Sequence, residues 1–196
     1  MRGSAVTGNA ELGVVIRTGD ELTIRESLVA DTLAAGDGSY GVGVACSASQ
    51  AMTLSNSVVN SSRTAGVIVA NGCAALLEQL LIDGVAPGSF YTYEGETLNI
   101  KETYDGIGDG IAMNDKASAT LRDVLVRQAA RGAVVIDSCD GTLERVRAEG
   151  LRFGLVMQSS PGVSWTEGAN EFRGGDKDIL SDGMLPVPGP PPMPED

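Results

Sequence analysis

A glycine followed by an apolar–any–apolar triplet recurs along the chain, and its spacing constrains the fold more than any other feature. The phrase begins at Gly13, Gly41, Gly66, Gly110, Gly132 and Gly154. The last two intervals are 22 residues each, and the preceding interval of 44 residues equals two such periods, with Gly88 at its midpoint. Because a fixed period marks a repeat architecture, this spacing predicts about seven units of about 22 residues.

Two further landmarks occur within the units. A Thr/Leu phrase follows the glycine at residues 22–24, 52–54, 75–77, 96–98, 119–121 and 141–143. A third short apolar run follows in most units, for example at residues 80–82 and 124–126. Three short strands per unit, with no helical period, are typical of one turn of a parallel β-helix, whose coils stack at a strand spacing of about 4.8 Å.

This layout resembles the right-handed parallel β-helix repeat of pectate-lyase-like proteins, and the segment NEFRGGDKDI at 170–179 is similar to their closing coils. The resemblance covers about residues 8–180. It implies an all-β, single-stranded right-handed parallel β-helix, a solenoid of about seven coils. We expect residues 1–7 to be an N-terminal extension or vector-derived remnant, and residues 181–196 to be a Pro-rich tail or linker.

The outward-facing side of the first strand is unexpectedly apolar. Alternation places the third residue of each phrase, counting the glycine as the first, on the outside. These third positions are Val15, Gly43, Ile68, Phe90, Ala112, Val134 and Val156. An apolar outward row predicts a covered surface, and two covers are consistent with the sequence. Either another segment of the same chain, such as the tail, lies over it, or another domain or subunit packs there. The second alternative makes Val15, Ile68, Phe90, Val134 and Val156 a candidate partner face and favours a homo-oligomer.

The second strand has an outward row rich in threonine, at Thr23, Thr53, Thr97, Thr120 and Thr142. Threonine is a good half-exposed strand residue and forms ladders between neighbouring strands, so the row has a structural explanation. The alternative is an ice-binding plane. The next outward row contains long charged side chains such as Arg122 and Glu144, which argue against the required flatness.

Aromatic residues suggest one binding hypothesis and one capping role. Tyr91, Tyr93 and Tyr104 lie close to Phe90 in the sequence and could stack on a saccharide ring, or they could simply pack together. Trp165 aligns with inward-facing leucines in the last full unit, with Phe172 close behind. That position predicts an aromatic cap on the apolar end of the column.

The composition removes several kinds of chemistry. The chain has no histidine, which excludes Ser-His-Asp catalysis and every metal site that contains histidine. The three cysteines show no C-x-x-C spacing. Cys73 and Cys139 lie three units apart, and Cys46 is offset by two positions from Cys73, so we expect no disulfide and three small buried side chains.

Acidic residues keep one enzymatic hypothesis open. Pectate-lyase-like enzymes use Ca²⁺ held by carboxylates, with an arginine or lysine as base, and Asp105, Asp109, Asp115 and Asp123 are the candidate acids or calcium ligands. Arg122 and Arg145 are the nearest basic candidates. A turn role also explains Asp115. The sequence contains no lyase or polygalacturonase motif, and it indicates no metal site beyond this cluster.

Charge and hydropathy restrict the partners. The net charge of −12 argues against nucleic acids and anionic membranes, and no apolar run of about 18 residues predicts membrane insertion. The sequence shows no signal peptide, whereas the resemblance implies an extracellular or cell-surface protein of bacterial or phage type. We therefore expect a non-catalytic scaffold or binding module for a polysaccharide or another protein domain. The alternative is a carbohydrate-active enzyme, a lyase, hydrolase or epimerase, that acts on an acidic polysaccharide.

Overall fold

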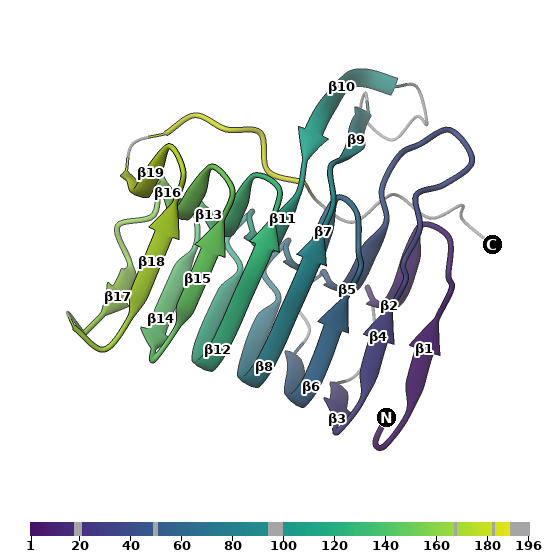
Figure 1. Ribbon diagram of the computed structural model, residues 1–196, viewed down its shortest axis with the longest axis horizontal. Helices are drawn as coiled ribbons and strands as arrows, with labels where there is room; N and C mark the ends of the chain where they lie inside the picture. The colour runs from purple at the N-terminus through teal and green to yellow at the C-terminus, as the bar shows by residue number, and fades with distance from the viewer. Residues whose placement is uncertain (18–20, 49–50, 94–99, 167, 182, 189–196) are drawn as a thin grey trace.

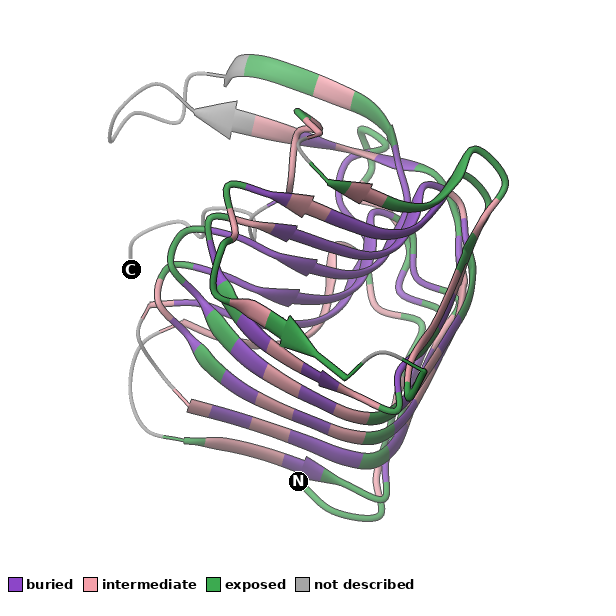
Figure 2. Ribbon diagram, turned by 90° about the vertical axis from the view of Figure 1, so that its left-hand side faces the viewer, coloured by how far each residue is buried: buried purple, intermediate pink, exposed green. Residues whose placement is uncertain are grey.

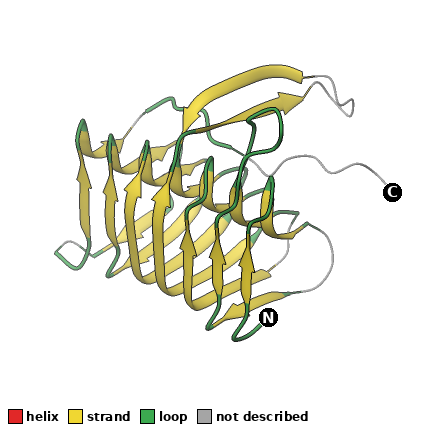
Figure 3. Ribbon diagram, turned by 45° about the vertical axis from the view of Figure 1, so that its right-hand side comes forward, coloured by secondary structure: helices red, strands yellow, loops and turns green. Residues whose placement is uncertain are grey.

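The described part of the chain consists of strands and turns without any helix, as Figure 3 shows. The computed structural model describes residues 1–196 except 18–20, 49–50, 94–99, 167, 182 and 189–196, together with the side chains of residues 92, 93, 100 and 101. Within these residues the all-β prediction is confirmed. Two large sheets, one of ten strands and one of seven, contain only parallel pairs, and a two-stranded antiparallel hairpin stands apart from them.

The seven-stranded sheet has its members in chain order from one edge to the other. They are β2 (Leu12–Ile16), β5 (Val42–Cys46), β7 (Ala65–Val69), β11 (Asp109–Met113), β13 (Gly132–Asp137), β16 (Phe153–Gln158) and β19 (Lys177–Ser181). The ten-stranded sheet contains β1 (Ala5–Thr7), β3 (Leu22–Arg25), β4 (Leu28–Ala30), β6 (Ala51–Asn60), β8 (Ala74–Val85), β12 (Ser118–Ala129), β14 (Asp140–Glu144), β15 (Arg147–Gly150), β17 (Val163–Trp165) and β18 (Glu171–Gly174). The chain passes back and forth between the two sheets, which face each other across the core (Figure 1).

The ten-stranded sheet has the register that the threonine row predicts. Thr23 pairs with Thr53, Thr53 with Leu76, and Leu76 with Thr120; Thr142 and Ser164 continue the column. The long strands β6, β8 and β12 each bend at a residue with positive φ, at Asn56, Gln79 and Asp123. Arg145 has the same conformation between β14 and β15. These residues are stacked, so the bend is a continuous corner of the sheet.

Close packing between the sheets explains the repeated glycine. A Cβ atom added to Gly43 would lie 2.5 Å from Cγ1 of Val59, and one added to Gly66 would lie 2.6 Å from Cγ2 of Ile82. Real carbon atoms do not approach so closely, so a branched side chain from the facing strand takes the space a larger residue would need. The glycine phrase therefore marks where the sheets approach each other.

The glycine ladder differs in two places from the predicted alignment. The register places Gly43, and not Gly41, beside Gly13 and Gly66. It also places Ala133, and not Gly132, between Gly110 and Gly154. Any sufficiently small residue fits the ladder, which is why alignment on glycines alone misplaced these strands. As a consequence, Val134 faces the core between the sheets, and the prediction that it points outward is wrong.

Among the described residues, the unit predicted to begin at Gly88 contributes no strand to either large sheet. β7 pairs directly with β11, and β8 pairs directly with β12. The intervening residues include the hairpin of β9 (Gly88–Tyr93) and β10 (Ile100–Ile107), which projects past the ends of the middle strands near β7 and β11 (Figure 1). The predicted landmark at 96–98, with Thr97, lies outside the described residues.

Both ends of the chain add to the sheets. β1 pairs with β4, so residues 5–7, expected to be part of an extension, belong to the ten-stranded sheet. At the other end Trp165 has the inward register of Leu143 but is 38 % exposed, because β17 is the last strand on this side. Val163 and Phe172 pack against the core there.

The structure corrects the cysteine prediction. Cys46 and Cys73 form a disulfide with a Cα–Cα distance of 6.1 Å. Cys73 follows a tight turn in which Asn71 and Gly72 have positive φ and the N–H of Cys73 donates to the carbonyl of Ala70. This turn folds the chain back toward the end of β5. The two-position offset between Cys46 and Cys73 in the repeat alignment therefore overestimated the distance between the two cysteines. Cys139 is free and buried, as expected.

Thiol counting tests this pairing. Burial raises the pKa of the Cys139 thiol to about 11, so the reactive thiolate is scarce at neutral pH. The native, unreduced protein is expected to show no thiol that reacts with a chromogenic disulfide reagent. The unfolded protein is expected to show one thiol without reductant and three after reduction. Three thiols in the unfolded, unreduced protein would contradict the disulfide.

Candidate functional site

The candidate partner face is only partly formed. Val15, Ile68 and Val156 do lie on one outward row of the seven-stranded sheet, together with other small or apolar side chains. We call this set the outer row: Val15, Ala45, Ile68, Ala112, Val135, Val156 and Leu180. Val135 takes the place predicted for Val134, while Phe90 comes from the hairpin and lies on top of the row.

The chain itself covers the outer row. Figure 2 shows the five inner strands of the seven-stranded sheet, β5, β7, β11, β13 and β16, buried along nearly their whole length, whereas the edge strands β2 and β19 are partly exposed. Over the first half of the sheet, Phe90 and Ile107 of the hairpin pack against Ile68 and Ala112, together with Tyr40. Ile68 is completely buried in this cluster. This arrangement corresponds to the first alternative drawn from the sequence, cover by a segment of the same chain.

The Pro-rich tail covers the second half. We call residues 183–188 the tail segment; it runs from the end of β19 toward β11 and the base of the hairpin (Figure 1). Its Leu185 and Val187 pack against Val135, Phe153 and Val156. Val135 and Val156 have no solvent exposure. The tail segment is therefore docked against the sheet, although it forms no strand.

Side chains at the ends of three inner strands of the seven-stranded sheet bind the backbone of the tail segment. Gln158 Nε2 donates to the carbonyl of Leu185 at 2.8 Å, and its Oε1 accepts from the N–H of the same residue. Arg131 Nη1 donates to the carbonyl of Pro186 at 2.8 Å. Asn114 Nδ2 donates to the carbonyl of Val187 at 3.4 Å. Gln158 and Asn114 stand in the same place at the ends of β16 and β11, so two strand ends hold residues two apart in the tail.

A buried ion pair holds Arg131 in position for its hydrogen bond to the tail segment. Arg131 Nε donates to Oδ1 of Asp109 at 2.9 Å, and Nη2 donates to Oδ2. The side chains are 5 % and 0 % exposed. Burial raises the pKa of Asp109, and the charge of Arg131 opposes that rise. The pair fixes the guanidinium so that its remaining nitrogen points at the tail segment.

The aromatic group packs locally. The rings of Phe90 and Tyr104 stack with centroids 5.0 Å apart, and the rings of Tyr40 and Tyr91 meet edge to face at 6.2 Å. The Tyr104 hydroxyl donates to Glu102, a bond that raises the pKa of Tyr104. The side chain of Tyr93, the third candidate for a saccharide contact, lies outside the described residues.

The four candidate acids do not meet. Asp105 accepts a hydrogen bond from Ser89 in the hairpin, and Asp109 is buried against Arg131. Asp115 lies in the turn after β11 with positive φ, and Asp123 lies on the bend of β12. Among the described residues no group of three or more acidic or cysteine side chains could hold a metal ion, so the calcium ligands proposed from the resemblance do not converge.

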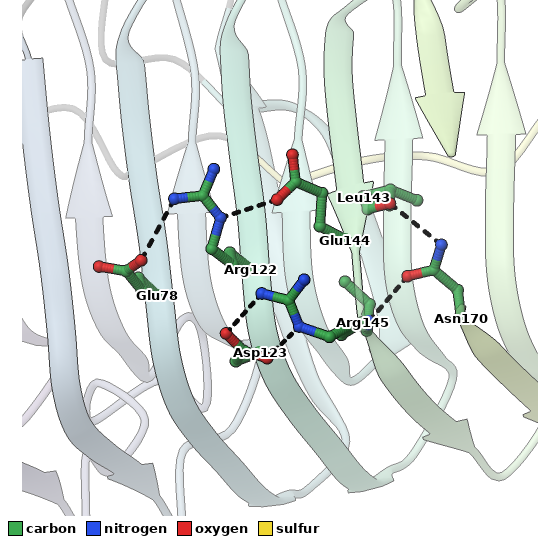
Figure 4. A network of polar contacts seen from close by, with 8 residues as sticks. Glu78, Arg122, Asp123, Leu143, Glu144, Arg145 and Asn170 are labelled. Atoms are coloured by element: carbon green, nitrogen blue, oxygen red, sulfur yellow. Dashed lines mark hydrogen bonds and ion pairs between the residues drawn. The ribbon is translucent and has the colours of Figure 1, made fainter. Parts of the chain in front are cut away.

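The candidate bases belong to ion-pair ladders that cross the strands (Figure 4). Arg122 Nε donates to Glu144 at 2.7 Å, and its Nη1 donates to Glu78 at 3.4 Å. Arg145 holds Asp123 with two bonds of 2.6 and 2.8 Å. These bonds lower the pKa values of Glu144 and Asp123, so both carboxyl groups stay ionised at neutral pH. A carboxylate of that kind is a poor general acid.

The outer face of the ten-stranded sheet holds a shallow depression of about 450 Å³ across β6, β8, β12 and β14. Its floor contains Thr53, Leu76, Thr120 and Thr142, and Asp140 borders it. The tail segment and the hairpin lie over the other sheet. Neither the hairpin nor the tail segment covers this depression, so within the described part of the chain it is open to a partner.

Sequence reasoning missed the residues that bind the tail. Asn114, Arg131 and Gln158 are polar residues at strand ends, where a turn role explains such side chains equally well. A usable signal exists in the tail itself, because Leu185 and Val187 are spaced to bury alternate side chains. The alternate apolar residues of the tail could therefore have been assigned, from the sequence, as the cover of the apolar outer row.

A comparison of the chain with protein-family models, with curated proteins and with solved structures gives no match. Among the described residues there is no helix of the length and apolar character needed to cross a membrane.

Proposed function

We propose that the two sheets are the faces of one right-handed parallel β-helix, with the architecture of pectate-lyase-like proteins, which acts as a non-catalytic scaffold or binding module. The strands alternate between the two sheets, and all their pairs are parallel, which supports this reading. The right hand follows from the general preference for right-handed crossovers between parallel strands.

The separation of the candidate catalytic residues carries the proposal. Polysaccharide lyases and hydrolases need acidic and basic groups that converge on one sugar. Here Asp109 and Asp123 are each engaged by a different arginine, and Asp105 and Asp115 lie in the hairpin and in a turn. Side chains held in this way stabilise the fold and leave no free acid–base pair on the described surface of β12 and β14.

The disulfide supports a location outside the reducing cytosol. Disulfides form and persist in oxidising compartments and are rare in cytosolic proteins. The Cys46–Cys73 bond links β5 to the turn after β7 and so joins neighbouring strands of one sheet. We therefore assign the module to the cell surface or the extracellular space, as expected for a bacterial or phage protein of this architecture.

The uncovered depression is the surface we propose for binding. An extended ligand could run across the strands and meet the hydroxyl groups of Thr53, Thr120 and Thr142 at intervals set by the strand spacing. A polysaccharide offers a matching row of hydroxyl groups. The other sheet, by contrast, is already covered by the hairpin and the tail segment.

A turnover assay separates the module from an enzyme. We expect no unsaturated or shortened products when the protein is incubated with polygalacturonate or alginate and Ca²⁺. Retention on the same immobilised polysaccharides should decrease when Thr120 and Thr142 are both changed to valine, which removes the two hydroxyl groups without adding charge, and should be unchanged for Arg152→Lys. Turnover by the wild type that is lost in Asp123→Asn would establish the enzymatic alternative instead.

A further inference from the structure

The tail segment is held as a bound peptide is held. Its described residues pair with no strand, and three side chains, Asn114, Arg131 and Gln158, hydrogen-bond to its backbone. Its apolar contacts come from Leu185 and Val187, which enter one cluster with Val135 and Val156. No strand pair of either large sheet includes a residue of the segment.

The donors of the face match the chemistry of a proline-rich segment. Proline has no N–H, so a chain with proline at every second position offers carbonyl acceptors and few donors. The face supplies side-chain donors for three successive carbonyls, those of Leu185, Pro186 and Val187. Proline also restricts the residue before it to extended conformations, which reduces the entropy lost on docking.

The fit of the chain's own segment is incomplete. Asn114 is 8 % exposed, and within the described residues its buried Oδ1 accepts no hydrogen bond. The residue after Val187 is Pro188, which has no N–H to offer. A cavity of about 500 Å³ lies between the segment and the sheet; Tyr104, Asp137 and Ser159 line one side, and residues 183–186 of the segment itself line the other. The face thus has an acceptor that the tail segment does not satisfy.

We propose that the outer row over β16, β13 and β11, with Asn114, Arg131 and Gln158, is a binding site for an extended segment of a partner protein in which apolar residues alternate with proline. Residues 183–188 occupy this site as a built-in competitor. The net charge of −12 makes a second copy of this chain a poor occupant, because two such copies repel each other, and it favours a neutral or basic partner segment. The site lies on a different sheet from the proposed polysaccharide surface and does not depend on it.

A fluorescent peptide of the sequence Gly-Met-Leu-Pro-Val-Pro-Gly tests the proposal on the full chain by anisotropy. In the variant Leu185→Asp/Val187→Asp the tail cannot pack on the apolar row, so the site is open. We expect this variant to bind the peptide at least tenfold more tightly than the wild type, whose site is occupied in cis. Met184→Asp is the matched control, because Met184 is exposed, and it should bind like the wild type.

A second change tests the location of the site. Gln158→Ala, added to the open variant, removes both bonds to the backbone of residue 185 and should weaken peptide binding at least tenfold. Circular dichroism establishes that each variant is folded, and Leu185→Ala/Val187→Ala replaces the aspartate pair if that variant unfolds. Equal peptide affinity of wild type and open variant would overturn the proposal. A second outcome would also overturn it: the wild type is a dimer in which the two copies exchange tail segments, and the open variant binds no peptide.

Discussion

Gly110→Ala is expected to lower the free energy of unfolding by about 3 kcal/mol, the upper part of the range for overpacked cores. An added Cβ would lie 2.5 Å from the carbonyl oxygen of Ala133 and would collide with Cγ1 of Val126. Neither neighbour is the end of a flexible side chain, so the strands must move apart. Chemical denaturation followed by circular dichroism measures the change.

The adjacent ladder position suggests a second substitution that should partly restore the stability of Gly110→Ala. Ala133 takes the ladder position next to Gly110, and Ala148 takes the position next to Val126. Because Ala148 is smaller than Val126, it leaves space for the Cβ atom of Ala133, so alanine is tolerated at that ladder position. Val126→Ala should therefore recover about 1 kcal/mol when it is combined with Gly110→Ala. Gly36→Ala, at a position with open space, should change stability by less than about 0.5 kcal/mol. A similar loss at both glycines would contradict the packing explanation.

Arg131→Met is expected to lower the free energy of unfolding by about 3–5 kcal/mol, because it leaves a buried carboxyl group without its cation. Asp109 is completely buried, and Arg131 supplies most of its hydrogen bonds. The same denaturation experiment detects the loss. The variant should also release the tail segment, since it removes the bond to Pro186.

Two further variants control this result. Arg152→Met breaks the ion pair with Asp176, whose side chains are 57 % and 53 % exposed, and should leave the unfolding midpoint essentially unchanged. Asp109→Ala combined with Arg131→Met removes both charges and should be at least about 1 kcal/mol more stable than Arg131→Met alone. If the double variant is the least stable of the three, the buried charge is not the cause.

The strand pattern could be predicted from the sequence because side chains alternate between inside and outside, and because stacked positions carry the same type of residue in successive repeats. The column from Thr23 through Thr53 and Thr142 to Ser164 has the predicted register. The register of the glycine ladder in the seven-stranded sheet was harder to predict, since a ladder position requires only a small residue and not glycine in particular. Gly132 lies one position away from Ala133, which meets that requirement, and alignment on glycine therefore turned Val134 outward.

Insertions and covering segments were harder to predict, for physical reasons. The hairpin from Gly88 to Ile107 is close to one repeat period in length, so spacing cannot distinguish it from another unit. The apolar outer row indicated a cover but not its identity. That identity depends on contacts between distant residues, such as Gln158 with Leu185, and no local pattern records them. The disulfide was missed for the same reason, because the turn before Cys73 determines its distance from Cys46.

The arrangement gives the two sheets different roles in the proposed module. The seven-stranded sheet carries the hairpin and the tail segment, and access to it depends on release of the tail. The ten-stranded sheet keeps an uncovered face, with charged ladders along its corner. In the proposed module, the ten-stranded sheet would therefore offer an open surface, and the seven-stranded sheet would offer one that opens when the tail segment is released.

A distance between two spin labels tests the stacked column most directly. Labels on Thr23→Cys and Ser164→Cys lie in the same column, separated by the strands β6, β8, β12 and β14. Pulsed electron–electron resonance should give a narrow distribution centred at roughly 24 Å between the backbones, the length of five strand spacings. A broad distribution, or a mean longer by several strand spacings, would contradict the proposal that the chain forms one continuous parallel β-helix.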